Sequence, residues 1–207
     1  MTVHLWLSRI AAVCLALQVS SAEAAVVAQT LRFSSVVIDA GHGGKDGGSV
    51  WNGLVEKKLC LDVAKRVETG LKKHNLKTVM TRRGDVFVEL EQRARIANRV
   101  PSSIFVSIHF NGSRKTIISG GEAYYRSPRG KILAAAVSRS IKSSVTGGTR
   151  GVFFADYKVL RETEMPAVLV EGGFITNRDE HALLRDKKYL AKIARGIAYG
   201  VDTYLKK

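Results

Sequence analysis

The chain has 207 residues, of which 45% are hydrophobic and 25% are charged. This composition predicts one globular domain whose core is large enough to fold without disulfide bonds, and it excludes a disordered, collagen-like or coiled-coil chain. Lysine and arginine number 33 against 18 aspartate and glutamate residues, and the resulting net charge of +15 indicates an anionic partner such as nucleic acid, a membrane surface or an acidic polymer.

Residues 1–24 have the three-part pattern of a signal peptide. Arg9 precedes an apolar stretch at 10–19, and Ala22 and Ala24 provide the small residues that signal peptidase accepts. Because a spanning helix needs about 20 apolar residues, we expect cleavage and secretion, to the periplasm or cell envelope, in place of a membrane anchor. A short linker, 25–34, would then lead into a folded domain at 35–207.

Hydrophobic patterns predict alternating strands and helices along this domain. Apolar, β-branched runs predict strands at 35–40, 77–81, 103–110, 122–126 and 166–171. Helical periodicity predicts helices at 56–73, 89–100, 131–145 and 178–205, the last with a break near Asp186. The alternation predicts an α/β fold, a single domain with a mostly parallel sheet and helices on both faces.

Polar side chains follow three of the predicted strands at their carboxyl ends, where ligands bind in sheets of this kind. His42 lies in a glycine-rich loop after the first strand, His109 near the end of the third, and Glu171 at the end of the last. Glu56 begins the first helix, where a simple helix-dipole carboxylate is the competing interpretation. Two histidines and a carboxylate from separate elements are the ligand set of a catalytic zinc.

Other catalytic signatures are incomplete in this sequence. The glycine-rich stretch around Lys45 lacks the spacing of a phosphate-binding loop, and neither a His-Glu-x-x-His nor a Gly-x-Ser-x-Gly motif occurs. Cys60 lies on the apolar stripe of the first helix, so we interpret it as a core residue and not as a nucleophile. As the only cysteine of the mature chain, it could form no intramolecular disulfide.

Five blocks of sequence, taken together and in order, resemble the zinc-dependent N-acetylmuramoyl-L-alanine amidases of bacterial cell walls. The blocks are VIDAGHGGKD at 37–46, EK at 56–57, TR at 81–82, SIHFN at 107–111 and PAVLVEGGFITN at 166–177. The resemblance implies a twisted sheet with flanking helices. It also implies one zinc ion per chain, held by His42, Glu56 and His109, with Glu171 as the catalytic carboxylate. The implied reaction is hydrolysis of the amide between the lactyl group of N-acetylmuramic acid and L-alanine.

Two further residues are candidates for substrate binding. Asn111, two residues after His109, is a candidate to hold the substrate carbonyl or orient a ligand, and a loop cap is the alternative of equal weight. Arg82 is a candidate to pair with a carboxylate of the stem peptide, and a solvated or structural arginine is the alternative.

The chain departs from the family pattern at two places. Gly47 stands where the family often has proline, and residues 112–120 form a short link where certain relatives insert a long segment that covers the zinc. We therefore expect no built-in plug, while a separate protein activator stays open. We expect a monomer that acts on peptidoglycan or its fragments and is held there by surface charge, with no nucleic acid partner and no membrane anchor.

Two other functions compete with this prediction. A zinc peptidoglycan peptidase that cuts within the stem peptide would keep the same ligands and change only the bond. A non-catalytic basic protein that binds the wall or nucleic acid would explain the charge, but it would not explain four polar residues placed at strand ends and at a helix start.

Overall fold

The computed structural model describes residues 33–206. The predicted signal peptide, 1–24, and most of the predicted linker, 25–34, lie outside the described residues and stay predictions. Within 33–206, no helix combines the length and the apolar composition that crossing a bilayer requires.

Six strands form the central sheet, in the spatial order β4, β1, β5, β8, β6, β7. β6 and β8 pair antiparallel and the other neighbours pair parallel, which confirms the predicted mostly parallel sheet. The strands are β1 (Ser35–Ala40), β4 (Lys77–Met80), β5 (Ser103–Asn111), β6 (Gly121–Tyr125), β7 (Thr149–Phe154) and β8 (Ala167–Phe174). A separate hairpin consists of β2 (Val50–Trp51) and β3 (Leu54–Val55).

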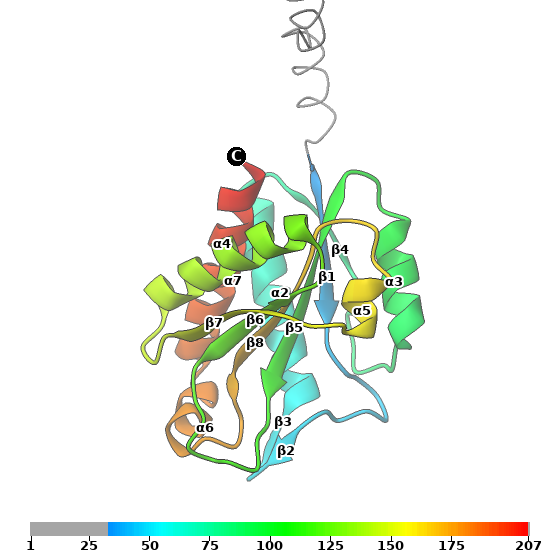
Figure 1. The fold of residues 1–207 in the computed structure, drawn as a ribbon. Helices are drawn as coiled ribbons and strands as arrows, with labels where there is room; N and C mark the ends of the chain where they lie inside the picture. Colours follow the sequence, from blue (N-terminus) through cyan, green and yellow to red (C-terminus); the bar gives the residue numbers. More distant parts are fainter. Residues whose placement is uncertain (1–32, 207) are drawn as a thin grey trace, which may run out of the picture. The chain divides into compact units, whose positions relative to one another are not determined.

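Helices cover both faces of this sheet, as Figure 1 shows and as the sequence predicts. The larger core cluster lies between the sheet and three long helices, α2 (Glu56–Lys73), α4 (Pro128–Ser144) and α7 (Lys187–Leu205). A smaller cluster lies on the opposite face, under α3 (Leu90–Asn98) and α5 (Lys158–Arg161). The short helix α6 (Arg178–Leu184) precedes α7.

The central strands are buried on both faces. Along β1, Val36 and Ile38 belong to the larger cluster, whereas Val37 belongs to the smaller one together with Phe105. Because successive side chains of a strand point to opposite faces, a two-sided core requires a continuous apolar run, and this is the pattern from which the strand is predicted. The predicted core position of Cys60 is confirmed, since its side chain is fully buried in the larger cluster.

Several element boundaries differ from the prediction for identifiable reasons. α4 begins earlier than predicted, because the Ser127 side chain accepts a hydrogen bond from the Gly130 N–H and proline stands at the first helical position. The predicted break in the last helix is confirmed, and the Asp186 side chain caps α7 by accepting from the Lys188 N–H. The last strand continues to Phe174, so Glu171 lies inside β8 and not at its end.

Four short elements were not predicted: β2, β3, β7 and α5. Aromatic residues on β2 and β7 and directly before α5 are less buried than core packing would require. Trp51 is 42% exposed, Phe154 is 62% exposed and Tyr157 is 42% exposed. These side chains are therefore surface or rim residues.

Close packing of α4 against α7 depends on a glycine at the contact. A Cβ atom at Gly200 would lie 2.5 Å from the Val137 Cα and 2.9 Å from the Ala136 carbonyl oxygen, and both atoms belong to the backbone of α4. We expect Gly200→Ala to lower the free energy of unfolding by about 1–3 kcal/mol, because overpacking outweighs the higher helix propensity of alanine. Chemical denaturation measures this change.

Gly84→Ala is the matched control for that variant. A Cβ atom at Gly84 meets no atom within 4 Å, so its effect on the free energy of unfolding is expected within about 0.5 kcal/mol. Equal free energies of unfolding for Gly200→Ala and Gly84→Ala would contradict this prediction. They would show that α4 and α7 accommodate the added methyl group without loss of stability.

Candidate metal centre

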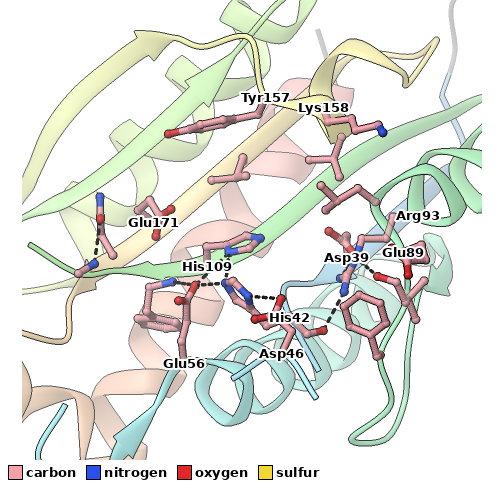
Figure 2. A pocket seen from close by; sticks show the side chains of 18 residues that line it. Asp39, His42, Asp46, Glu56, Glu89, Arg93, His109, Tyr157, Lys158 and Glu171 are labelled. Atoms are coloured by element: carbon pink, nitrogen blue, oxygen red, sulfur yellow. Dashed lines mark hydrogen bonds and ion pairs between the residues drawn. The ribbon is translucent and has the colours of Figure 1, made fainter. Parts of the chain in front are cut away.

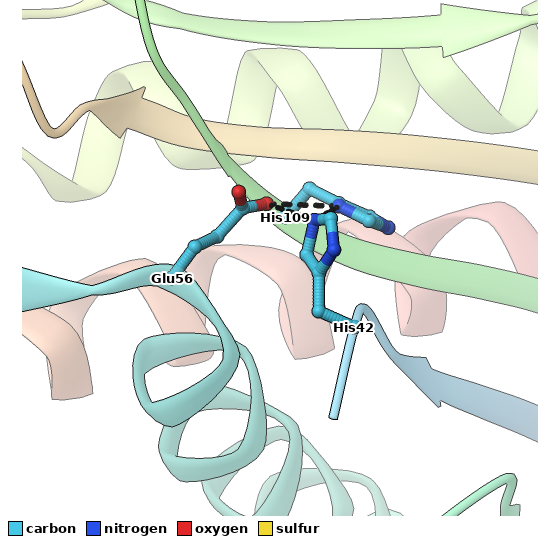
Figure 3. A group of neighbouring side chains, drawn as sticks. All are labelled: His42, Glu56 and His109. Carbon is cyan, nitrogen blue, oxygen red and sulfur yellow. Dashed lines mark hydrogen bonds and ion pairs between the residues drawn. The ribbon is translucent and has the colours of Figure 1, made fainter. Parts of the chain in front are cut away.

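Three side chains from separate elements converge at one edge of the sheet. His42 follows β1, Glu56 is the first residue of α2, and His109 lies near the end of β5. β1 and β5 are parallel neighbours, so their carboxyl ends meet at the same edge, as the strand-end argument requires. Figure 3 shows the three side chains pointing toward one another.

The distances within this group suit a single metal ion. Glu56 Oε1 lies 2.9 Å from His42 Nε2 and 2.9 Å from His109 Nδ1, and the two imidazole nitrogens are 3.2 Å apart. Two ligands about 2.0 Å from a tetrahedral metal are separated by about 3.3 Å, which is close to these values. Two imidazole nitrogens and one carboxylate oxygen are also the donor types of a zinc site with an open fourth position. The residues therefore fit zinc.

The backbone around His42 is shaped to present this ligand. His42 has a φ of +57°, in the left-handed region that residues with a Cβ rarely adopt. Gly41 packs directly against the His109 ring, and a Cβ atom at Gly41 would overlap the imidazole. A glycine at this position therefore lets the first loop approach the second histidine.

Hydrogen bonds behind His42 and Glu56 fix the orientation of these two ligands. His42 Nδ1 lies 2.7 Å from Asp46 Oδ2, which leaves Nε2 directed at Glu56. Glu56 Oε2 accepts from the Ser49 N–H at 2.8 Å, and Glu56 Oε1 accepts from the Phe110 N–H at 3.1 Å. Carboxylate and backbone partners of this kind set the tautomer and ring orientation of metal-binding histidines. Asp46 was not a predicted site residue. It lies four residues after His42 in the same glycine-rich block, and this proximity was the available signal.

The charges of the group favour binding a cation. Burial acts to raise the pKa of Glu56, but hydrogen bonds and charge interactions with His109 and His42 hold that pKa at about 2. Burial acts to lower the pKa of His42, but Glu56 and Asp46 together raise it above its usual value. Glu56 is therefore ionised at neutral pH, and a metal ion that binds here takes the place of the proton that Glu56 and Asp46 favour on His42.

Glu171 faces the same cavity from the neighbouring strand. Its Cα pairs in register with that of His109, since β5 and β8 run parallel side by side. Glu171 Oε2 is the one buried side-chain polar atom in residues 33–206 without a hydrogen-bond partner. Burial, together with the charges of Glu56 and Glu122, raises the pKa of Glu171 well above its usual range. A buried carboxylate oxygen left without a partner is costly, which points to a ligand or substrate group at this position.

A cavity of about 560 Å³ contains all four residues (Figure 2). Phe87, Val88 and Leu90 line one side of it, and Tyr157 and Val159 line another. Apolar walls around a few convergent polar groups are typical of substrate sites. Leu90 lies in the predicted helix at 89–100, whereas Phe87 and Val88 belong to a loop and Val159 to the unpredicted helix α5. The sequence pattern therefore gave no sign that these residues line one cavity.

The two predicted substrate-binding residues have different positions. Asn111 lines the cavity, where its Nδ2 donates to Glu122 Oε2 at 3.0 Å and its Oδ1 accepts from the Gly112 N–H at 2.8 Å. The bond to Gly112 is the predicted loop cap, and the substrate-binding role of Asn111 stays a prediction.

The predicted contact between Arg82 and a stem-peptide carboxylate is not supported by its position. Arg82 is 3% exposed, its guanidinium donates to four backbone carbonyls, and it does not line the cavity. The alternative, a structural arginine, is what the structure shows. The residue type alone could not distinguish a structural role from a substrate-binding role, because arginine serves in both.

Comparisons with known proteins identify relatives that match most of the chain. Residues 36–203 match the family model described as N-acetylmuramoyl-L-alanine amidase. The chain is 38% identical to the uncharacterized protein YqiI of Bacillus subtilis over 192 residues, which cover 91% of this chain and 93% of that protein. It is 35% identical to the N-acetylmuramoyl-L-alanine amidase LytC of Bacillus subtilis over 82% of this chain, and it spans only 35% of LytC.

Solved structures show the same fold. The structure of the N-acetylmuramoyl-L-alanine amidase AmiC2 of Nostoc punctiforme superposes with a TM-score of 0.80 at 41% sequence identity. The match covers 83% of this chain and 97% of the AmiC2 chain.

Proposed function

Because this chain belongs to the N-acetylmuramoyl-L-alanine amidase family, a family of enzymes that hydrolyse peptidoglycan, we propose that His42, Glu56 and His109 hold one zinc ion and that Glu171 is the catalytic carboxylate. The proposed substrate bond is the amide between the lactyl group of N-acetylmuramic acid and L-alanine. The observation that carries the proposal is the convergence of these three ligands beside a buried carboxylate oxygen that has no partner.

Each residue has a separate task in this reaction. A zinc ion at the site supplies Lewis acidity, which brings the pKa of water toward about 7 and polarises the substrate carbonyl. Glu171 takes a proton from the attacking water and delivers it to the nitrogen of L-alanine, because an amide nitrogen leaves poorly unless it is protonated. The raised pKa of Glu171 suits a carboxylate that must hold this proton between the two steps.

The surroundings of Glu171 support this role. Its strand neighbour Glu122 is already occupied, because Glu122 accepts hydrogen bonds from Asn111, Tyr124 and Arg150. Glu171 lines the cavity, and its Oε2 has no such partner. Of these two neighbouring carboxylates, Glu171 is therefore the one that is available for proton transfer.

The wider context is also part of the proposal. The match to cell-wall amidases and the net charge of +15 support an anionic wall polymer as the partner. Secretion, to the periplasm or cell envelope, depends on the predicted signal peptide at 1–24. A monomeric state and a protein activator stay predictions.

Analysis of the products tests the proposed bond. Purified peptidoglycan is incubated with the zinc-loaded protein, and the soluble products are identified by mass spectrometry. We expect stem peptides with a free N-terminal L-alanine and glycan strands with an intact lactyl carboxylate. Cleavage between two stem amino acids would identify a peptidase, and intact wall after incubation would favour a binding protein.

A further inference from the structure

Arg82 links the two segments that carry His42 and Glu56. Its Nη2 donates to the carbonyl oxygen of Gly41 at 2.7 Å and to that of Lys57 at 2.8 Å. Gly41 directly precedes His42, and Lys57 directly follows Glu56. One nitrogen of one side chain therefore connects the backbone beside one ligand with the backbone beside the other.

The rest of the guanidinium holds Arg82 in this position. Its Nε donates to the Ala40 carbonyl at 2.9 Å, and its Nη1 donates to the Gly84 carbonyl at 3.0 Å. Arg82 is almost fully buried and forms no ion pair with any carboxylate in residues 33–206. Four carbonyl acceptors in place of a counter-ion require the planar five-donor fork of arginine, which a lysine ammonium cannot reproduce.

The carbonyl that Arg82 holds also affects the third ligand. Gly41 packs against the His109 ring so closely that a Cβ atom would overlap it. A shift of the Gly41 backbone would therefore move His42 along the chain and His109 by direct contact. Arg82 is thus connected to all three ligand positions, although its guanidinium donates only to backbone carbonyls and to none of their side chains.

Other contacts in the region do not duplicate this bridge. Arg93 donates to the His42 carbonyl at 2.8 Å, but its remaining partners are Asp39, Ala40 and Val88, and none belongs to α2. Three hydrogen bonds also join the loop to the start of α2: from Lys57 Nζ to the Gly44 carbonyl, from the Lys57 N–H to the Gly47 carbonyl and from the Glu56 N–H to the Ser49 carbonyl. All three reach the loop beyond His42 in the chain, whereas Arg82 holds the residue before it.

We propose that Arg82 is a positioning residue that fixes the spacing between His42 and Glu56 and thereby sets the affinity of the site for zinc. This inference rests on the zinc site of the proposed function. It assigns to Arg82 a role toward the metal ligands in place of the predicted role toward the substrate.

The test compares Arg82→Lys with Arg83→Lys in the full chain. Arg83 is the matched control, because it is the adjacent residue and its guanidinium pairs only with Glu68 in the middle of α2. Zinc affinity is measured by competition with a chromogenic chelator, and the melting temperature of each metal-free protein is measured in parallel. We expect Arg82→Lys to bind zinc about 10–100-fold more weakly, the usual effect of losing a partner behind a ligand, and Arg83→Lys to bind as the wild type does.

A second readout reports the arrangement of the ligands. The visible absorption of bound Co²⁺ depends on coordination geometry, so we expect the spectrum of Arg82→Lys to differ from those of the wild type and Arg83→Lys. A lower melting temperature with unchanged zinc affinity and an unchanged Co²⁺ spectrum would overturn the positioning role and leave Arg82 as a purely structural residue. Absence of zinc binding by the wild type would instead overturn the metal site itself.

Measurements on the wild type cover the case in which Arg82→Lys fails to fold. In that case the hydrogen bonds from Arg82 Nη2 to the Gly41 and Lys57 carbonyls are examined in the metal-free wild type. We expect side-chain nitrogen NMR of the metal-free protein to show Arg82 Nη2 hydrogens that are protected from exchange and that keep their shifts when zinc binds. Rapidly exchanging Nη2 hydrogens would overturn the proposal.

Discussion

Glu171→Gln is expected to lower the rate of amide hydrolysis by about 10²–10⁴-fold, a loss of about 2.7–5.5 kcal/mol of transition-state stabilisation. Glutamine keeps the length and shape of the side chain but cannot accept the proton of water. Because Glu171 Oε2 has no hydrogen-bond partner, the substitution breaks no hydrogen bond of that atom. The variant should therefore keep its bound zinc, and the neutral amide also removes the cost of burying a charge.

Single-turnover kinetics on a soluble muropeptide and zinc analysis of the same sample measure the two effects. Glu180→Gln is the control, because Glu180 is also a buried carboxylate, but both its oxygens accept backbone N–H groups, from Gly120 and Phe174. We expect that control to lose stability and to keep the rate of the chemical step. Loss of zinc in Glu171→Gln would make Glu171 a ligand, and a near-normal rate with zinc bound would assign the proton to another group.

His109→Ala is expected to remove both the zinc and the activity. Its Nδ1 is one of three donors that converge on one point, and two remaining ligands hold zinc weakly. The zinc content measured by elemental analysis should fall from about one ion per chain to near zero, with hydrolysis falling in proportion. Thermal melting should then be insensitive to added zinc, whereas zinc stabilises the wild type by binding its folded state.

His74→Ala is the matched control for the ligand assignment. His74 follows the end of α2 and lies outside the cavity lining, 3.4 Å from Asp202. We expect this variant to keep full zinc content and activity. Full zinc occupancy in His109→Ala would show that the metal is bound elsewhere.

The sequence determined most of the central elements because their signals are local and strong. The helix at Glu56–Lys73 and the strand at Ser35–Ala40 have the predicted bounds. The helix has a sustained amphipathic stripe, and the strand is a short, β-branched apolar run that ends at a glycine cluster. The ligand candidates could be found for a related reason. Parallel strands bring their carboxyl ends to one edge, so polar residues after consecutive strands are neighbours before any side chain is placed.

The short elements and the strand pairings could not be predicted from local sequence patterns. β7 carries Gly151 and exposed aromatic residues, and it becomes a strand only by pairing with β6, which lies far from it in the chain. α5 is a single turn whose buried residues, Val159 and Leu160, pack under the sheet. Local propensity is too weak to predict such segments, because tertiary contacts supply most of their stability.

The roles of individual polar side chains were decided by the tertiary structure. The sequence identified His42, Glu56, His109 and Glu171 as chemically competent, but only the folded chain brings the first three donors within 3.2 Å of one another and leaves Glu171 Oε2 unpaired. Arg82 shows the limit most clearly. A guanidinium can face a substrate carboxylate or backbone carbonyls, and the choice depends on which loops surround it. Those loops come from distant parts of the chain, so the pattern of residue types determined where the chemistry lies, and three-dimensional packing determined which side chains support it.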